Sequence, residues 1–233
     1  MKIIDFIFSN NDYFKDFVTR SVTTSNNIEG NTLSHAETYA IIFNDNSFVV
    51  NAKPREMYEA VNLKYALNNI LNNIQQPLTE QLIKKTAITI NKNINEISGY
   101  RSVPVFIKGA EYIPPQPNQI NQQMMYFVHN YNNTEYDDIF EKLAKTHIEF
   151  ERIHPFDDGN GRTGRLLLTF ELLKNNVPPV VISKEERIKY FNMLADEDFV
   201  SLQEFFKELS LKEKERLSLF GYKDFNKNKQ LER

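Results

Sequence analysis

The chain has 233 residues and contains no cysteine, so disulfide bonds and thiolate chemistry are excluded. Neither sign of charge dominates: 28 lysine and arginine residues stand against 31 aspartate and glutamate residues. A general nucleic-acid binder would carry a basic face, and this balance argues against one. The sequence also lacks an apolar run of membrane-spanning length, and residues 1–5 do not begin a long apolar leader segment. We therefore expect a cytoplasmic protein with neither a membrane nor a nucleic-acid partner.

What the chain does have is enough apolar material for a folded domain. Hydrophobic residues make up 41% of it, which can fill a core, and its length suits a single domain with at most a small appended segment. Apolar residues recur at the spacing of one helix face through most of the sequence. The helices that this pattern predicts cover residues 12–27, a run after Pro54, a run from near residue 79, and approximately 136–152, 166–173, 184–195 and 202–215.

Residues 99–117 have a different character. The run 103–107 is rich in β-branched and aromatic side chains, Lys108 and Gly109 can turn the chain, and the prolines at positions 114, 115 and 117 end the segment. This composition predicts a short, exposed β-hairpin inserted between helices. The expected fold class is therefore all-α with one small β-hairpin.

Phosphate-binding features are concentrated in residues 154–165, which read His-Pro-Phe-Asp-Asp-Gly-Asn-Gly-Arg-Thr-Gly-Arg. Gly159 and Gly161 allow backbone N–H groups to approach an anion closely. The helix predicted to follow adds free N–H groups and the positive end of its dipole. Arg162 and Arg165 are three residues apart, so they share a helix face and can clamp a di- or triphosphate.

Two further side chains of this segment add chemistry to the phosphate cradle. Asp158 places a carboxylate beside it, which suits Mg²⁺ held partly by phosphate oxygens. His154 can take up a proton near neutral pH. Taken singly, these residues have ordinary interpretations as a helix cap, a turn and a solvated helix face. Their occurrence together within twelve residues favours a functional site.

The twelve residues resemble the signature of the Fic family, His-x-Phe-x-Asp/Glu-Gly-Asn-Gly-Arg-x-x-Arg, at every defined position, and the similarity extends over about residues 25–205. The resemblance implies a Fic-type helical bundle whose β-hairpin is the flap of that family. It also implies a division of the chain. The expected parts are an N-terminal segment with an inhibitory helix at 1–50, a Fic core at 51–210 with the flap near 101–115 and the active-site loop at 154–165, and a C-terminal helix with a polar tail at 211–233.

The activity implied by the resemblance is that of a protein adenylyltransferase, which moves AMP from ATP to a Ser, Thr or Tyr hydroxyl of a target protein. In this interpretation His154 is the general base, and Asp158 ligates Mg²⁺ between the α- and β-phosphates. Arg162 binds the β-phosphate and Arg165 the γ-phosphate. The full set of expected nucleotide-binding residues is Gly159, Asn160, Gly161, Arg162, Arg165 and, beside the adenine, Tyr190.

The flap of this family holds the target by adding a strand to the edge of the hairpin. The residues expected to bind the unidentified target protein are Val105, Phe106, Ile107, Lys108, Gly109, Ala110, Glu111 and Tyr112. Family members often pair through helical surfaces, so the resemblance also leaves room for a homodimer.

A second motif, residues 25–30, resembles the inhibitory motif of the family, Ser/Thr-x-x-x-Glu-Gly/Asn. Ser25 and Glu29 are four residues apart and share a helix face, and Gly30 is suited to end that helix. A carboxylate at a helix C-terminus faces an unfavourable dipole and gains from a cationic partner. The resemblance implies that Arg165 is this partner, so that Glu29 occupies the γ-phosphate contact and restrains transfer.

Three alternatives remain open. Some Fic proteins remove AMP, with the inhibitory glutamate orienting a water molecule, and Glu29 is placed in the sequence for either role. Phosphate transfer, as in the Doc toxins, is disfavoured because that group has lysine where this chain has Gly161. A catalytically silent module that senses ATP is disfavoured by the intact His154 and Asp158.

Overall fold

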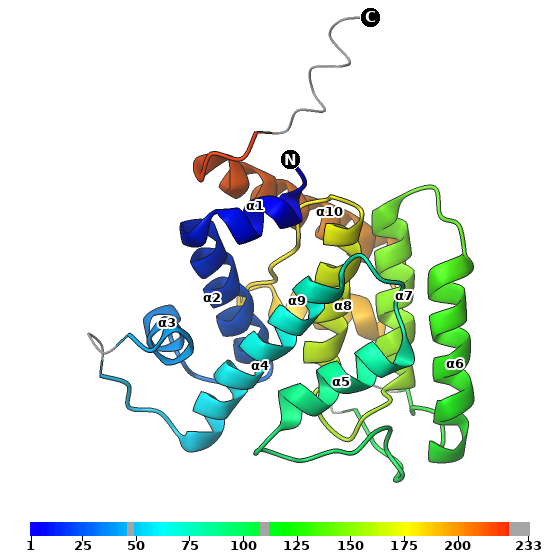
Figure 1. Cartoon of the computed structure of the whole chain (residues 1–233). Helices are drawn as coiled ribbons and strands as arrows, with labels where there is room; N and C mark the ends of the chain where they lie inside the picture. Colours follow the sequence, from blue (N-terminus) through cyan, green and yellow to red (C-terminus); the bar gives the residue numbers. More distant parts are fainter. Residues whose placement is uncertain (46–48, 108–111, 224–233) are drawn as a thin grey trace, which may run out of the picture.

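The computed structural model describes residues 1–45, 49–107 and 112–223, and within these ranges the chain forms ten helices and no strand. The all-α class expected from the sequence is confirmed. The helices are α1 (Ile3–Ser9), α2 (Asn11–Ile28), α3 (His35–Phe43), α4 (Pro54–Asn73), α5 (Glu80–Asn91), α6 (Pro117–Asn133), α7 (Ile139–Ile153), α8 (Asn160–Lys174), α9 (Arg187–Ala195) and α10 (Phe199–Leu219) (Figure 1).

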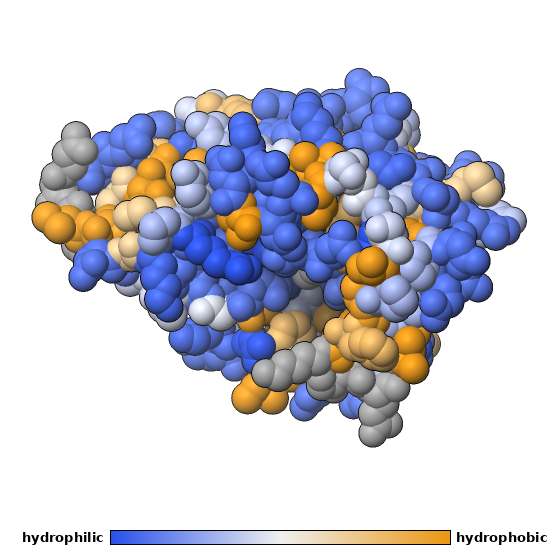
Figure 2. All heavy atoms as spheres, turned by 90° about the horizontal axis from the view of Figure 1, so that it is seen from below, coloured by the Kyte–Doolittle hydropathy of each residue, from blue (hydrophilic) through white to orange (hydrophobic). Residues whose placement is uncertain are grey.

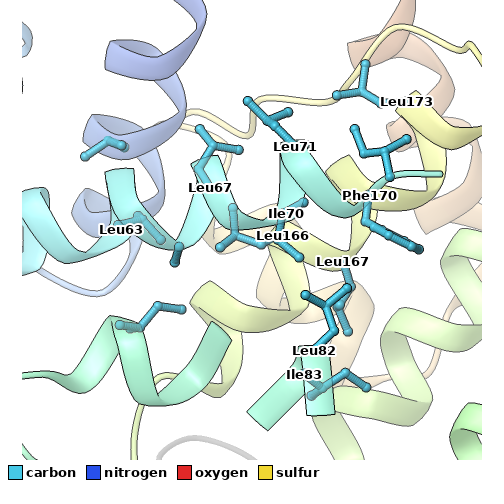
Figure 3. Close-up of a cluster of buried hydrophobic side chains, with 14 of the residues drawn as sticks. Leu63, Leu67, Ile70, Leu71, Leu82, Ile83, Leu166, Leu167, Phe170 and Leu173 are labelled. Atoms are coloured by element: carbon cyan, nitrogen blue, oxygen red, sulfur yellow. The ribbon is translucent and has the colours of Figure 1, made fainter. Parts of the chain in front are cut away.

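Helix α8 lies at the centre of the bundle (Figure 1) and contacts α2, α4, α5 and α7. Thirteen of its 15 residues are buried, so it is enclosed on all sides. Close packing of leucine, isoleucine and phenylalanine side chains drives this burial, because each contributes about 1.5–3 kcal/mol when fully removed from water. The side chains that meet around α8 in Figure 3 are Leu63, Leu67, Ile70 and Leu71 of α4, Leu82 and Ile83 of α5, and Leu166, Leu167, Phe170 and Leu173 of α8 itself.

Local capping signals account for most helix starts. The side chains of Asn10, Thr79, Asp138 and Asp198 accept hydrogen bonds from backbone N–H groups in the first turns of α2, α5, α7 and α10. Pro54 stands in the first turn of α4, where its missing N–H costs nothing. The seven helices expected from apolar spacing correspond to α2, α4, α5, α7, α8, α9 and α10.

Three helices were not expected. Helices α1 and α3 are only 7 and 9 residues long, too short to show several turns of apolar periodicity. Helix α6 begins at Pro117, a residue that the sequence analysis assigned to the end of the hairpin. Proline can end an extended segment or occupy the first turn of a helix, and its presence alone does not distinguish the two.

The expected β-hairpin is not formed by the described residues 99–107 and 112–116. Two strands without a third are marginally stable, and Pro104, Pro114 and Pro115 cannot donate ladder hydrogen bonds. The carbonyl oxygens of Val103 and Pro115 are instead bound by the side chain of Arg101. Residues 108–111, part of the expected target-binding flap, lie outside the described residues, as does the polar tail from 224 onward.

The N-terminal helices share the main core with the rest of the bundle. Tyr13, Phe17 and Val22 of α2 are fully buried in it. Tyr13 donates a hydrogen bond of 2.6 Å to Glu213 Oε1 of α10, and Arg20 binds both carboxylate oxygens of the same residue. The division of the chain at residues 50 and 210 stays a prediction, and α10 runs across the second of these positions. None of the described helices is both long and apolar enough to cross a membrane.

We predict that Glu213→Ala lowers the free energy of unfolding by about 1–3 kcal/mol, because it removes the acceptor of the buried Tyr13 hydroxyl and one of the two carboxylates that pair with the half-buried Arg20. Urea unfolding followed by circular dichroism measures the change. Glu208→Ala on the exposed side of α10 is the matched control and should change stability by no more than about 0.5 kcal/mol. Equal effects of the two substitutions would contradict the prediction.

Candidate active site

Residues 154–159 connect the end of α7 to the start of α8. His154 caps α7 in the left-handed conformation, at φ 47° and ψ 60°, and Phe156 turns its side chain fully into the core. Asn160 closes the loop, because its side-chain amide accepts from Phe156 N at 2.9 Å and donates to Phe156 O at 2.8 Å. Asn160 is 2% exposed and thus shapes the loop from inside.

Gly159 is required at the start of α8 for two reasons. Its φ of 80° lies in the region that side chains rarely adopt, and a Cβ there would come within 2.8 Å of Asn91 Nδ2. The Gly159 N–H donates to the carboxylate of Asp158 at 2.6 Å, and Asn91 Nδ2 donates to Asp158 O at 3.0 Å. Asn91 of α5 therefore holds the loop in place where α8 begins.

Arg162 projects from the first turn of α8 and Arg165 from the second, and they are 3% and 8% exposed. Arg162 donates to Asp158 Oδ1 at 3.1 Å, and its Nη1 lies 4.0 Å from a carboxylate oxygen of Glu59. Arg162 Nε and Nη1 and Arg165 Nη1 are buried and find no hydrogen-bond partner among the described residues. Buried N–H groups without partners are costly, so the site is suited to receive an anion with several acceptor oxygens.

Glu29 and Ser25 of α2 meet Arg165 across 136 and 140 residues of sequence. Arg165 Nη2 donates to Glu29 Oε1 at 2.6 Å and to Ser25 O at 3.0 Å, and Nε donates to Ser25 Oγ at 2.8 Å. Gly30 follows with φ 99° and ends the α2 region. The structure thus brings Ser25 and Glu29 of the second motif to Arg165, as the resemblance implied.

The charge state of Glu29 follows from its surroundings. Loss of hydration alone would raise its pKa, but the guanidinium groups of Arg165, Arg162 and Arg187 together lower it below the ordinary value. A Cβ placed on Gly161 would lie only 2.6 Å from Glu29 Oε1. The ionised carboxylate therefore occupies the N-terminal turn of α8, the position where a helix attracts anions.

His154 is set up to accept a proton. Its Nδ1 lies 3.2 Å from the carbonyl oxygen of Glu151, so in the neutral ring Nδ1 carries the hydrogen and Nε2 has a free lone pair. Burial lowers the pKa of His154 and the charge of Arg101 adds to this, against the raising effects of its backbone hydrogen bond, Glu29 and Asp158. The net shift is downward, which keeps the imidazole neutral near pH 7.

Tyr190 is not placed where the sequence analysis expected it. Its side chain is fully buried, and its hydroxyl lies 2.6 Å from His147 Nε2, so the described structure gives it no surface on which an adenine could lie. The reason is the packing of α9, which turns Tyr190 and Met193 into a second core cluster shared with α7 and α10. Tyr190 therefore lies in the core next to Arg165.

Sequence reasoning missed the acidic residue of this buried cluster. Glu151 has an oxygen without a hydrogen-bond partner among the described residues, and burial raises its pKa to about 8, against a lowering by Arg165. Gly164 leaves room for it: a Cβ there would overlap Glu151 Oε1 and lie 2.9 Å from His147 Cε1. A glycine inside a helix that is otherwise leucine-rich was the available signal.

Two arginines outside the motif also belong to the site. Arg55, in the first turn of α4, lies with its Nη2 3.6 Å from Asp158 Oδ2 and is largely exposed. Arg101 is 2% exposed and donates to the carbonyl oxygen of His154 at 2.7 Å. Neither could be found from spacing, because both are brought to the loop from other parts of the chain.

The described residues of the expected flap lie beside this site. Phe106 is 81% exposed, and the ring of Tyr112 lies 3.8 Å from the guanidinium carbon of Arg152. A pocket of about 570 Å³ has Tyr112, Pro115, Ile153, Tyr126 and Phe199 among its lining residues. Seen from below, the surface is mostly hydrophilic, with hydrophobic residues singly or in small groups (Figure 2). Of the remaining expected flap residues, Val105 and Ile107 are half-buried.

Residues 77–172 match the family model described as Fic/DOC family. This range includes α5 and the active-site loop but not Glu29. The protein adenylyltransferase Fic of Aedes aegypti is 30% identical over 190 residues, which are 77% of this chain and 37% of that protein. The protein of the same name from Nematostella vectensis is 30% identical, over 77% of this chain and 43% of its own length. The chain thus spans about two fifths of these relatives.

Solved structures share the fold. A Fic-domain-containing signalling protein from Bacteroides thetaiotaomicron has a TM-score of 0.78 at 24% identity, covering 90% of this chain and 93% of its own. Fic-1 from C. elegans has a TM-score of 0.75 at 24% identity, covering 91% of this chain and 64% of its own. These likenesses extend beyond residues 77–172 to nearly all of the bundle. Residues 77–172, which contain the His154–Arg165 signature at the junction of α7 and α8, therefore form a domain of the Fic/DOC family.

Proposed function

We propose that this chain transfers AMP from ATP to a hydroxyl group of a target protein and that Glu29 restrains the transfer. The observation that carries the proposal is the set of buried arginine N–H groups at the start of α8 that have no hydrogen-bond partner among residues 1–45, 49–107 and 112–223, beside a neutral histidine. The proposal is supported by the name of the curated relatives, protein adenylyltransferase Fic.

The first turn of α8 is the proposed site for the phosphates of ATP. Arg162 Nε and Nη1 and Arg165 Nη1 would find acceptors in phosphate oxygens, and the backbone N–H groups near Gly161 would add to the binding. A triphosphate satisfies more of these donors than a single carboxylate does. This is the fit that favours a nucleotide over a small monoanion.

Asp158 is the proposed Mg²⁺ ligand. Its Oδ1 accepts hydrogen bonds from Gly159 N and Arg162, whereas in the part of the chain that the structure describes Oδ2 is approached by Arg55 alone, at 3.6 Å. No cluster of three or more acidic or histidine side chains that could hold a metal occurs in the described ranges. Mg²⁺ commonly uses one or two carboxylates together with substrate phosphates, so this donor set fits an ion that arrives with ATP. Such an ion neutralises phosphate charge.

His154 is the proposed general base. Its Nε2 takes the proton of the target hydroxyl, and the oxygen forms a bond to the α-phosphorus as the bond to the β-phosphate oxygen breaks. Pyrophosphate carries away the negative charge, which Arg162 is placed to stabilise. The products are the AMP-modified hydroxyl and pyrophosphate, and the proton remains on His154 until solvent removes it.

Glu29 restrains this reaction by competition at Arg165. A charge-assisted contact of 2.6 Å at the N-terminal turn of α8 fills the place that the γ-phosphate requires. ATP must either displace the carboxylate or bind with its α-phosphate out of line. The hydrogen bond from Arg165 Nε to Ser25 holds the guanidinium in the inhibited orientation.

The ionised state of Glu29 also supports a second candidate, hydrolytic removal of AMP from a modified protein. The Glu29 carboxylate is close enough to raise the pKa of His154, so it can orient a water molecule for attack on the AMP group. Incubation of an AMP-modified target with the protein in the absence of ATP distinguishes the two: loss of AMP from the target supports removal.

We predict that Glu29→Gly increases AMP transfer about 5- to 150-fold, the range of a coupling of 1–3 kcal/mol. In the same background, His154→Ala should lower transfer about 100- to 10,000-fold, because the base is lost. ATP radiolabelled at the α-phosphate, with Mg²⁺ and a soluble protein lysate as acceptor, reports the rate. Glu135→Gly, an exposed glutamate that precedes α7, is the matched control and should transfer at the unmodified rate.

Equal labelling by the unmodified chain and Glu29→Gly would exclude the brake. Persistent labelling by the His154→Ala variant would exclude the base. Mass spectrometry of the labelled lysate identifies the added mass, the modified residue and the target.

We further predict that His154 titrates below its ordinary pKa of 6.5 in the nucleotide-free protein. The shifted pKa means that the neutral form persists to lower pH, so the base is available throughout the range above 6.5. Imidazole chemical shifts followed by NMR from pH 4 to 8 measure the midpoint, and the signal is assigned by its loss in His154→Ala. A midpoint at or above 6.5 would contradict the prediction.

A further inference from the structure

Arg101 is a buried cation that forms no ion pair with the described residues and satisfies its donors at backbone oxygens. Its guanidinium donates to four backbone carbonyl oxygens: His154 O from Nε at 2.7 Å, Val103 O from Nη1 at 3.0 Å, and Pro115 O and Ile153 O from Nη2 at 2.6 and 3.5 Å. Its own N–H donates to Pro155 O at 2.9 Å. Every donor group of this residue is thus directed at main chain.

The four carbonyl oxygens come from three segments that meet at the site. Ile153 and His154 are the last residue of α7 and its cap, where helix carbonyls lack intrahelical partners. Val103 and Pro115 lie on the outgoing and returning arms of the segment between α5 and α6. One side chain therefore joins both arms of this segment to the backbone of the proposed base.

The backbone of His154 needs such support. A φ of 47° is uncommon for a residue other than glycine, and it persists only where the surroundings hold it. Arg101 binds the carbonyl of His154 through its side chain and the next carbonyl, that of Pro155, through its backbone. The direction of the imidazole thus depends on the residue that opens the flap segment.

We propose that Arg101 is a positioning residue that holds His154 and both arms of the flap segment as one unit. The inference rests on the proposed function, because the two parts that it joins are the base and the segment expected to hold the target. The target hydroxyl is delivered by one part and deprotonated by the other. Their relative position sets the distance over which the proton moves, and a displacement of about 1 Å can lower a rate about 100-fold.

Lysine cannot replace arginine in this role. The guanidinium is a rigid planar fork with five N–H donors, whereas an ammonium is a single point with three. Carbonyl oxygens that approach from three directions can be bound simultaneously by the fork only. Arg101→Lys therefore keeps the charge and most of the volume but loses the connection between the arms and His154.

The charge of Arg101 provides a separate readout. The charged groups that act on His154 are Arg101, which lowers its pKa, and Glu29 and Asp158, which raise it. Arg101→Gln removes a lowering influence, so the pKa of His154 should rise and the acidic limb of the rate profile should move to higher pH. Arg101→Lys keeps the charge and should leave the limb in place.

The test compares Arg101→Lys and Arg101→Gln in the Glu29→Gly background, with ATP radiolabelled at the α-phosphate, Mg²⁺ and lysate proteins as acceptor. We expect Arg101→Lys to lower the rate at saturating ATP about 100-fold. The KM for ATP should stay within about twofold, because the phosphate contacts at Arg162 and Arg165 are untouched. Arg20→Lys is the matched control: Arg20 makes three side-chain hydrogen bonds, but to Asp16 and Glu213 and to no residue of the site, so this variant should lose stability and keep its rate.

The outcomes separate the two proposals. Absence of label transfer by the Glu29→Gly parent refutes the proposed function itself. Transfer by the parent with an unchanged rate in Arg101→Lys overturns the positioning role, as does a parallel rise in the KM for ATP, which would indicate general damage. An acidic limb that does not move in Arg101→Gln also counts against the inference.

Hydrogen exchange in the Glu29→Gly parent tests the connection without altering Arg101. The amide of Arg101 is bonded to Pro155 O and that of His154 to Phe150 O. If one side chain holds both segments, the two amides should exchange with the same opening free energy and the same dependence on urea. Independent exchange would overturn the inference even if the Arg101 variants do not fold.

Discussion

A buried guanidinium group requires acceptors, and the active end of this bundle is organised by that requirement. Helices α2, α4, α5 and α7 pack around α8, and this packing buries Arg162 and Arg165 of its first two turns. There the two side chains retain N–H groups that no described residue accepts, which is a cost that an anion can remove. Glu29 removes part of it by binding Arg165, and we propose that ATP removes more. In this proposal Glu29 and ATP satisfy the same buried arginine N–H groups, so they compete for them.

Arg101 and Arg165 meet the same requirement in opposite ways. Arg165 is bound by a carboxylate on a different helix, so its partner can be exchanged for another anion. Arg101 is bound by carbonyl oxygens of the main chain, which nothing can displace without moving the backbone. The first arrangement suits a contact that must be released, and the second suits a fixed reference between base and flap segment. Next to Arg165 lies a buried cluster that consists of Tyr190, His147 and Glu151.

The fold could be predicted from sequence where its signals are local. Apolar spacing identified seven helices, because this signal acts within a few turns. Capping residues such as Thr79 and Asp138, seen in the structure, account for where two of these helices begin. The prediction was wrong where one residue type serves two structures: the proline run was assigned to the end of a hairpin, although Pro117 begins α6. The expected hairpin depended on pairing that the described arms do not make, since Arg101 binds their carbonyl oxygens.

The sequence by itself determined the parts of the active-site loop, because the histidine, carboxylate, glycines and arginines of residues 154–165 are joined by one helix end and one helix start. The resemblance of residues 25–30 to the inhibitory motif also implied the pairing of Glu29 with Arg165, which the structure contains. The tertiary structure alone decided the burial of Tyr190, which follows from the packing of α9 on α7 and α10. It alone decided the role that we infer for Arg101, because backbone carbonyl oxygens are common to every residue and leave no trace in a sequence.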